Sequence, residues 1–324
     1  MTEPLLSIQG LEVAFPSRHG PVQALRGVDL AVNTGECLGL VGESGSGKSL
    51  SAFAAMSLLP PNAGVTGGRV RFDGRDVLEL PERELETIRG RHMAMIFQEP
   101  MTALNPVMRV GEQIAAPLRR HLGLSRREAR KRAIEQLELV GIPDPVARID
   151  VYPHEMSGGM RQRVMIAMAL ACQPKLLIAD EPTTALDVTI QAQIIELLNR
   201  LRQELGLAIV IITHDLGVVA EMAGRVAVMY GGRVVEEAPV ETLFDRPLHP
   251  YTRGLIASTP DVEAPVERRL RTIAGAVPHI TEMPSGCAFH PRCPERIEIC
   301  QREVPHDNRH DDRSRVACWA RKAG

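Results

Sequence analysis

The chain has 324 residues, of which 44% are hydrophobic and 24% are charged, and its formal net charge is −2. This size allows a large core and predicts one large domain plus a smaller one. The near-neutral charge gives no basic field, so nucleic acid is not expected as a partner. The apolar stretches are far shorter than the about 18 residues that cross a bilayer. No secretory signal is visible, so we expect a cytosolic protein with reduced thiols.

Alternating apolar segments open the chain at Leu5 to Phe15 and Val22 to Val32, and we expect them to pair as strands. Arg69 to Gly74 alternates in the same way and ends in a tight turn. These segments predict a small antiparallel sheet that precedes and flanks the main core.

A buried strand at Glu36 to Val41 leads into the run GESGSGKS and then into a helix expected from Ser49 to Leu59. The run fits the phosphate-loop pattern, and a strand before it with a helix after it is the context that the pattern requires. Its glycines let backbone N–H groups aim at phosphate oxygens beside the positive end of the helix dipole. The lysine neutralises the β and γ phosphates, and the serine hydroxyl binds Mg²⁺. The residues expected to hold a nucleoside triphosphate are Gly42, Glu43, Ser44, Gly45, Ser46, Gly47, Lys48 and Ser49.

Later strands are unbroken apolar runs, as is typical of parallel strands buried on both faces. They lie at Met93 to Phe97, Lys175 to Asp180 and Leu207 to Thr213. Helical patterns alternate with them at Arg126 to Leu139, Gly158 to Ala171 and Thr189 to Glu204. The alternation predicts an α/β protein.

Two acidic residues and a histidine are expected at the edge of this parallel sheet. Asp180 ends one strand and can reach the Mg²⁺ bound by Ser49, and Glu181 beside it can polarise an attacking water. His214 follows the next strand and is expected to hydrogen-bond the γ phosphate.

The run SGGM opens the helix at Gly158 to Ala171. Ser157 is expected to cap this helix, and Gly158 and Gly159 leave its N-terminus bare, which gives a second anion site in the same chain. One nucleotide cannot easily use both sites, so we expect a head-to-tail dimer in which this helix closes over the partner's nucleotide.

Together these residues resemble the ATP-binding cassette (ABC) family of transporter ATPases over roughly the first 245 residues. Gln98 matches the Q-loop, the segment 185–187 the D-loop and His214 the switch histidine, while Met160 stands where the family usually has glutamine. The resemblance implies that Glu181 is the general base, that Asp180 binds Mg²⁺ through water and that Gln98 senses Mg²⁺ and the attacking water. It also implies that Ser157, Gly158 and Gly159 contact the γ phosphate of the partner's ATP. Phe15 stands roughly where the family stacks an aromatic ring on adenine, and a core role for it is equally expected.

The same resemblance implies partners in a membrane. Such ATPases dock on membrane subunits after the Q-loop, here Glu99 to Ile114, where Met101, Leu104 and Met108 are either docking residues or ordinary core. We expect a related second ATPase forming a heterodimer, two integral permease subunits and an extracytoplasmic solute-binding protein. The chain would then lie on the cytoplasmic face of the inner membrane.

The last eighty residues set this chain apart within the family. Four of its six cysteines lie close together in the sequence: Cys287, Cys293, Cys300 and Cys318. In a cytosolic protein such a group favours metal over disulfides, and four thiolates suit a [4Fe–4S] cluster or Zn²⁺. The spacing lacks the short C-x₂-C pairs of zinc knuckles, which favours the cluster, while simple reduced cysteines remain the third alternative. The segment HPYT and these cysteines resemble the oligopeptide and dipeptide importer branch.

The expected fold is therefore an ABC-type P-loop NTPase core with an N-terminal antiparallel β subdomain, a helical signature subdomain and a small Cys-rich C-terminal extension. We expect the ATPase domain at residues 1–245 and the extension at 246–324. The expected function is ATP-driven import of oligopeptides or dipeptides. The alternatives are a nickel or other small-solute importer of the same branch and a non-transport ABC ATPase acting on nucleic acid or the ribosome.

Overall fold

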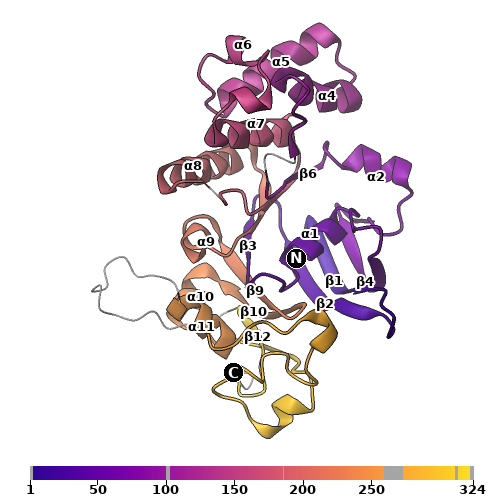
Figure 1. Cartoon of the computed structure of the whole chain (residues 1–324), viewed down its shortest axis with the longest axis vertical. Coiled ribbons are helices and arrows are strands. Elements are labelled where there is room, and N and C mark those ends of the chain that lie inside the picture. Colours follow the sequence, from indigo (N-terminus) through magenta and orange to yellow (C-terminus); the bar gives the residue numbers. More distant parts are fainter. Residues whose placement is uncertain (1–2, 100–102, 185, 259–272, 311–312, 322–324) are drawn as a thin grey trace. The chain divides into compact units, whose positions relative to one another are not determined.

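The computed structural model describes residues 3–99, 103–184, 186–258, 273–310 and 313–321 (Figure 1). The chain folds as two compact units. The first comprises residues 1–32, 37–78 and 213–324, and the second comprises residues 33–36 and 79–212.

The first unit contains a four-stranded antiparallel sheet in the order β2-β1-β4-β5. Its strands are β1 (Leu6–Phe15), β2 (Val22–Val32), β4 (Gly64–Phe72) and β5 (Arg75–Asp76). β1 pairs with both β2 and β4, and its inward side chains Leu11 and Val13 are fully buried. The expected antiparallel sheet is confirmed, although β4 begins at Gly64, ahead of the segment predicted from Arg69.

Five further strands of the first unit follow the order β11-β12-β10-β9-β3. They are β3 (Cys37–Val41), β9 (Arg225–Tyr230), β10 (Arg233–Pro239), β11 (Asp307–Arg309) and β12 (Arg315–Ala317). β3 is parallel to β9, and the other neighbours are antiparallel. The helices are α1 (Lys48–Ala55), α9 (Leu216–Met222), α10 (Val240–Asp245) and α11 (Pro250–Ser258), with 3₁₀ turns at Ile280–Glu282 and Glu298–Gln301. The prediction that the first helix extends to Leu59 is wrong, because Ser57 adopts a left-handed backbone conformation with φ of 52°.

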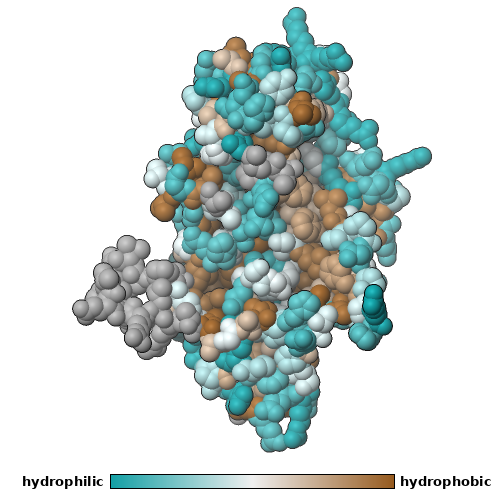
Figure 2. Space-filling model, in the orientation of Figure 1, coloured by the Kyte–Doolittle hydropathy of each residue, from teal (hydrophilic) through white to brown (hydrophobic). Residues whose placement is uncertain are grey.

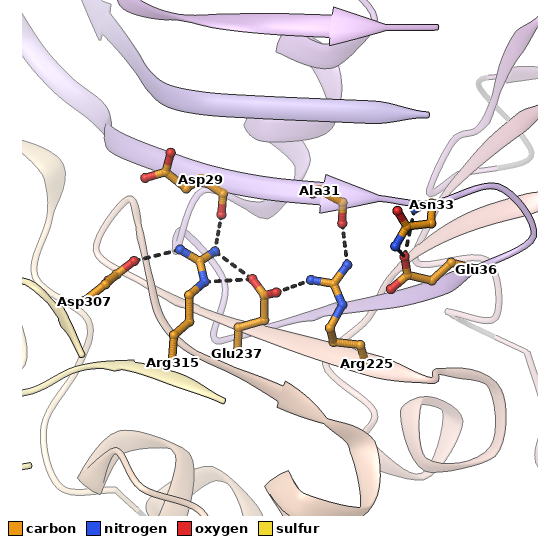
Figure 3. Close-up of polar contacts among 8 residues, drawn as sticks. All are labelled: Asp29, Ala31, Asn33, Glu36, Arg225, Glu237, Asp307 and Arg315. Carbon is orange, nitrogen blue, oxygen red and sulfur yellow. Dashed lines mark hydrogen bonds and ion pairs between the residues drawn. The ribbon is translucent and has the colours of Figure 1, made fainter. Parts of the chain in front are cut away.

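A buried ion network fastens the C-terminal strands to the rest of this unit. Figure 3 shows the Glu237 carboxylate between the guanidinium groups of Arg315 and Arg225. Each arginine also donates to a backbone carbonyl of β2, Arg315 to Asp29 and Arg225 to Ala31. These charge-assisted bonds add to the short backbone pairing of the three-residue β12 with β10 and connect β12 to β2 as well.

The second unit contains three parallel strands in the order β8-β7-β6. They are β6 (Met93–Ile96), β7 (Leu176–Asp180) and β8 (Ala208–Ile212). All residues of β7 and β8 are buried, which confirms the interpretation of the unbroken apolar runs. The helices are α2 (Glu82–Ile88), α4 (Val110–Leu122), α5 (Arg126–Leu139), α6 (Pro145–Arg148), α7 (Gly158–Leu170) and α8 (Val188–Leu205), with a 3₁₀ turn at Pro153–Glu155. Figure 1 shows α4, α5, α6 and α7 gathered into one helical group.

The surface shown in Figure 2 is mostly hydrophilic, with hydrophobic patches scattered over it. Across the described ranges, no helix combines the length and the apolar character needed to cross a membrane.

Candidate functional site

The phosphate loop joins β3 to α1 in the first unit. Gly42 and Gly47 have φ values of 150° and 105°, a region that residues with a β-carbon rarely occupy. A β-carbon on Gly42 would lie 2.3 Å from the carbonyl oxygen of Met229, and one on Gly47 would lie 2.7 Å from a methyl group of Leu25. Only glycine therefore fits these two positions, and α1 begins directly afterwards at Lys48.

The Lys48 side chain is folded back into the loop. Its Nζ donates to the carbonyl oxygens of Gly42 at 2.8 Å and of Glu43 at 3.0 Å, and the residue is only 6% exposed. The Ser46 hydroxyl is fully buried and has no hydrogen-bond partner in the described part of the chain. The loop thus holds a positive charge and a polar hydroxyl close to its backbone, as a phosphate site requires.

A cavity of about 400 Å³ brings the phosphate loop and the histidine after β8 together within the first unit. Its lining residues are Val41, Gly42, Glu43, His214, Asp215, Leu216, Leu255 and Ser258. His214 therefore faces the same hollow as the start of the loop, while α11 supplies Leu255 and Ser258.

Phe15 is the last residue of β1, where it pairs with Val22 and is half-buried. A half-buried ring is compatible with both alternatives, packing in the core and stacking on adenine. Its role in adenine stacking stays a prediction.

The second unit carries the acidic pair at the end of β7. Asp180 is its last residue and is buried. The Glu181 Oε2 accepts hydrogen bonds from Gln98 Nε2 at 2.9 Å and from Thr184 Oγ1 at 2.8 Å. The structure thus brings Gln98 and Glu181 together from distant positions in the sequence. Thr184 was not singled out from the sequence, although its position three residues after Glu181, in a turn, was a usable signal.

The Glu181 backbone is held in an unusual conformation. Its φ is 48°, and its N–H donates to the carbonyl of Ile212 at 2.8 Å. A left-handed conformation costs a non-glycine residue about 1 to 2 kcal/mol, so the surrounding turn must fix it. The carboxylate direction is consequently set by both backbone and side-chain contacts.

The second anion site predicted from the sequence lies at the start of α7. The Ser157 hydroxyl caps this helix by accepting the N–H of Met160 at 3.3 Å, and both Ser157 and Gly158 are exposed. Gly159 faces Ile190, which a β-carbon would approach to 2.8 Å. The serine cap is confirmed, and contact of this helix end with a partner molecule stays a prediction.

Part of the segment expected to dock on membrane subunits is described. Leu104 is 2% exposed and belongs to the core, so a docking role for it is wrong. Val107 is 80% exposed and Met108 is partly exposed, while Met101 lies outside the described residues. The first residue of the expected D-loop, Ala185, is also outside them, and Asp187 is the residue before α8.

The four clustered cysteines are free thiols, with Cys300 and Cys318 buried and Cys287 and Cys293 half-buried. Burial, together with the neighbouring thiols, raises the pKa of Cys318 to about 11, and burial raises the pKa of Cys287 and Cys293. Among the residues that the structure describes, no group of three or more His, Cys, Asp or Glu side chains is arranged to hold a metal ion. The expected metal site in the C-terminal extension therefore has no support from this geometry.

Comparisons with known proteins match two regions of the chain. Residues 25–184 match the family described as ABC transporter, and residues 235–300 match the family described as oligopeptide/dipeptide transporter, C-terminal region.

Three relatives span nearly the whole chain. A probable peptide ABC transporter ATP-binding protein of Sinorhizobium fredii is 53% identical over 97% of this chain and 94% of its own length. An oligopeptide transport ATP-binding protein of Salmonella typhimurium is 52% identical over 93% and 89%. A dipeptide transport ATP-binding protein of Bacillus subtilis is 49% identical over 98% and 95%.

Solved structures resemble the chain as well. A dimeric ATP-binding cassette in a post-hydrolysis state with ADP and Pi has a TM-score of 0.65 and 30% identity over 72% of this chain and 98% of that one. A subunit of an ABC transporter complex of Clostridium perfringens has a TM-score of 0.64 and 28% identity over 76% and 92%.

Proposed function

Because the chain belongs to the ABC transporter family of ATPases, we propose that it hydrolyses ATP to power the import of oligopeptides or dipeptides. The observation that carries the choice of peptide is the match of residues 235–300 to the oligopeptide/dipeptide transporter region, alongside near-full-length relatives named for peptide transport. We assign the ATPase domain to residues 1–245 and the extension to 246–324.

For ATP hydrolysis we propose that the phosphate loop holds the triphosphate, with Lys48 on the β and γ phosphates. Glu181 is proposed as the general base that takes a proton from the attacking water, and His214 as a donor to the γ phosphate. The hydrogen bonds from Gln98 and Thr184 support the role of Glu181 because they hold its carboxylate in one position.

We propose that Ser49, Gln98 and Asp180 hold Mg²⁺, directly or through water. Their hydroxyl, amide and carboxylate oxygens are the hard donors that this ion prefers. When bound, Mg²⁺ neutralises charge on the phosphates.

We propose that the functional ATPase is a head-to-tail dimer with a related second subunit. The exposed Ser157 and Gly158 at the start of α7 support this arrangement, since they are free to approach the ATP of another molecule. The full importer is proposed to include two integral permease subunits and an extracytoplasmic solute-binding protein, with this chain on the cytoplasmic face of the inner membrane. The exposed Val107 and Met108 offer apolar surface for a permease contact.

We propose that the four clustered cysteines bind a [4Fe–4S] cluster, with Zn²⁺ as the other candidate. The chemistry of the donor set supports this, because four cysteines lie close together in the sequence of the extension and soft sulfur ligands suit both groups. When bound, the cluster would act as a crosslink within the extension.

Metal content tests the cysteine proposal. Protein purified without oxygen is assayed for iron, acid-labile sulfide and zinc, with Cys300→Ser as the test variant and the isolated Cys172→Ser as the control. About four irons and four sulfides per chain, lost only in Cys300→Ser, supports the cluster. Stoichiometric zinc without iron would assign the cysteines to a Zn²⁺ site. Absence of iron, sulfide and zinc would refute both the cluster and the Zn²⁺ site.

Solute uptake tests the proposed substrate. Cells lacking their own copy are complemented with the wild-type chain or with Lys48→Ala, and the uptake of a labelled dipeptide, a labelled pentapeptide and nickel is measured. Peptide uptake that depends on Lys48 supports the proposal. Uptake of nickel alone would assign the chain to small-solute import, and uptake of neither would refute import of these solutes.

A further inference from the structure

Arg292 of the C-terminal extension reaches the phosphate loop, 249 residues earlier in the chain. Its two terminal nitrogens form a bidentate ion pair with Glu43, Nη1 to Oε2 at 2.8 Å and Nη2 to Oε1 at 3.0 Å. Both residues belong to the first unit. Paired, parallel bonds of this kind fix direction as well as distance.

The guanidinium group is built into the extension. Its Nε donates to the carbonyl of Ala274 at 2.9 Å, and Nη2 also donates to the carbonyl of Gly275 at 3.2 Å. Nη1 lies 3.4 Å from the Tyr230 hydroxyl, and the group sits 5.9 Å from the centre of the Phe289 ring. The Arg292 side chain is only 5% exposed. A long side chain that is buried and hydrogen-bonded on all three nitrogens has little freedom left, so it transmits the position of the extension to Glu43.

A second contact holds the backbone of the same residue. The Glu43 N–H donates to the Tyr251 hydroxyl at 2.8 Å. Tyr251 lies in α11 and is fully buried, with its ring 4.7 Å from that of Tyr230 and 5.4 Å from that of Phe289. Packing of the Tyr251 ring against these two aromatic rings holds its hydroxyl in a fixed position. The extension therefore forms hydrogen bonds with both the backbone and the side chain of Glu43.

Glu43 in turn contacts Lys48, the lysine proposed to bind the phosphates. The Glu43 carbonyl accepts a hydrogen bond from Lys48 Nζ at 3.0 Å, and Glu43 also lines the cavity that contains His214. A shift of Glu43 would move a ligand of Lys48. An unpaired Glu43 carboxylate would also repel the phosphates of ATP.

We infer that Arg292 is a positioning residue of the phosphate loop, and that with Tyr251 it makes the affinity for ATP depend on the C-terminal extension. The inference rests on the proposed function, in that the ligand of the loop is taken to be ATP. The extension would thus take part in nucleotide binding, a role separate from any metal binding by its cysteines.

A merely structural ion pair would stabilise the extension without changing nucleotide affinity. Arg321 provides the matched control, because it pairs with Glu295 and donates to the carbonyl of Leu248 at 2.9 Å, away from the phosphate loop. Arg321→Gln breaks an ion pair within the same extension and leaves Glu43 untouched. The two arginine variants therefore separate the stability of the extension from the geometry of the loop.

The experiment is a titration of the full chain with a fluorescent ATP analogue, together with thermal unfolding. Arg292→Gln is expected to weaken binding about tenfold, since a charge-assisted pair is lost and Glu43 is left uncompensated. Adding Glu43→Gln to Arg292→Gln is expected to recover part of the lost affinity, because it removes the uncompensated carboxylate that repels the phosphates. Arg321→Gln is expected to lower Tm while leaving the affinity unchanged.

Three outcomes would overturn the inference. Arg292→Gln could bind the analogue as tightly as wild type, Arg321→Gln could weaken binding equally, or the double variant could bind more weakly than Arg292→Gln alone. Lys48→Ala, measured in the same titration, separates failure of the inference about Arg292 from failure of the proposed nucleotide site. If it too binds normally, the phosphate loop is not the nucleotide site and the proposed function fails first.

Discussion

Replacing Glu181 with glutamine tests the catalytic assignment with little change in structure. The carboxylate oxygen of Glu181 accepts hydrogen bonds from Gln98 and Thr184, and a glutamine carbonyl oxygen at the same place can accept both. The variant therefore keeps the position of the side chain and loses its charge and its basicity. General-base catalysis contributes about 10²- to 10⁴-fold, so we expect kcat to fall by about that factor, or about 2.7 to 5.4 kcal/mol. ATP affinity should change by less than about threefold, since the phosphate contacts remain.

The assay is single-turnover hydrolysis of radiolabelled ATP, with the affinity measured separately. Gln98→Ala removes one hydrogen bond to the charged carboxylate and should slow turnover by an intermediate factor of about 10- to 100-fold. Glu138→Gln makes the same chemical change on an exposed face of α5 and should leave the rate unchanged. A Glu181→Gln variant that turns over at the wild-type rate, or one that fails to bind ATP, would refute this reasoning.

Two further predictions concern stability. Arg315→Leu removes one of the two arginines that pair with the buried Glu237 and should lower the free energy of unfolding by about 3 kcal/mol. The control Arg302→Leu breaks an exposed ion pair and should cost almost nothing. Equal losses of the two variants in thermal unfolding would contradict a stabilising role for the Glu237 ion pairs. Burial lowers the pKa of His249 to about 3, below the about 6.5 of an unfolded histidine, so the unfolded state binds the extra proton and stability falls as pH drops below 6.5. Urea unfolding should show a loss of about 2 kcal/mol between pH 7 and pH 5 from this residue. His249→Asn, which keeps an acceptor for the Tyr251 N–H, should remove that loss, and an unchanged pH dependence would count against it.

Local features of this chain were predictable from the sequence. The phosphate loop lies between a strand and a helix as the pattern required, and Ser157 caps α7 as its side chain and the bare glycines suggested. The unbroken apolar runs gave the buried parallel strands because both of their faces are covered. In each case a few neighbouring residues contain the physical cause.

Features that depend on distant contacts were not predictable. β12 is three residues long and carries no periodic signal, and its place beside β10 depends on Arg315 reaching Glu237. The pairing of Glu43 with Arg292 joins two charges that look like ordinary surface residues in the sequence. The sequence left Leu104 as either a docking residue or ordinary core, and only the folded chain shows that it is buried.

The most direct test of the account is ATP hydrolysis by the complex reconstituted in lipid vesicles with its permease subunits and solute-binding protein, measured with and without peptide. The account predicts that peptide stimulates hydrolysis, that labelled peptide accumulates inside the vesicles and that Glu181→Gln abolishes both. Hydrolysis that proceeds without any transport of peptide would contradict it.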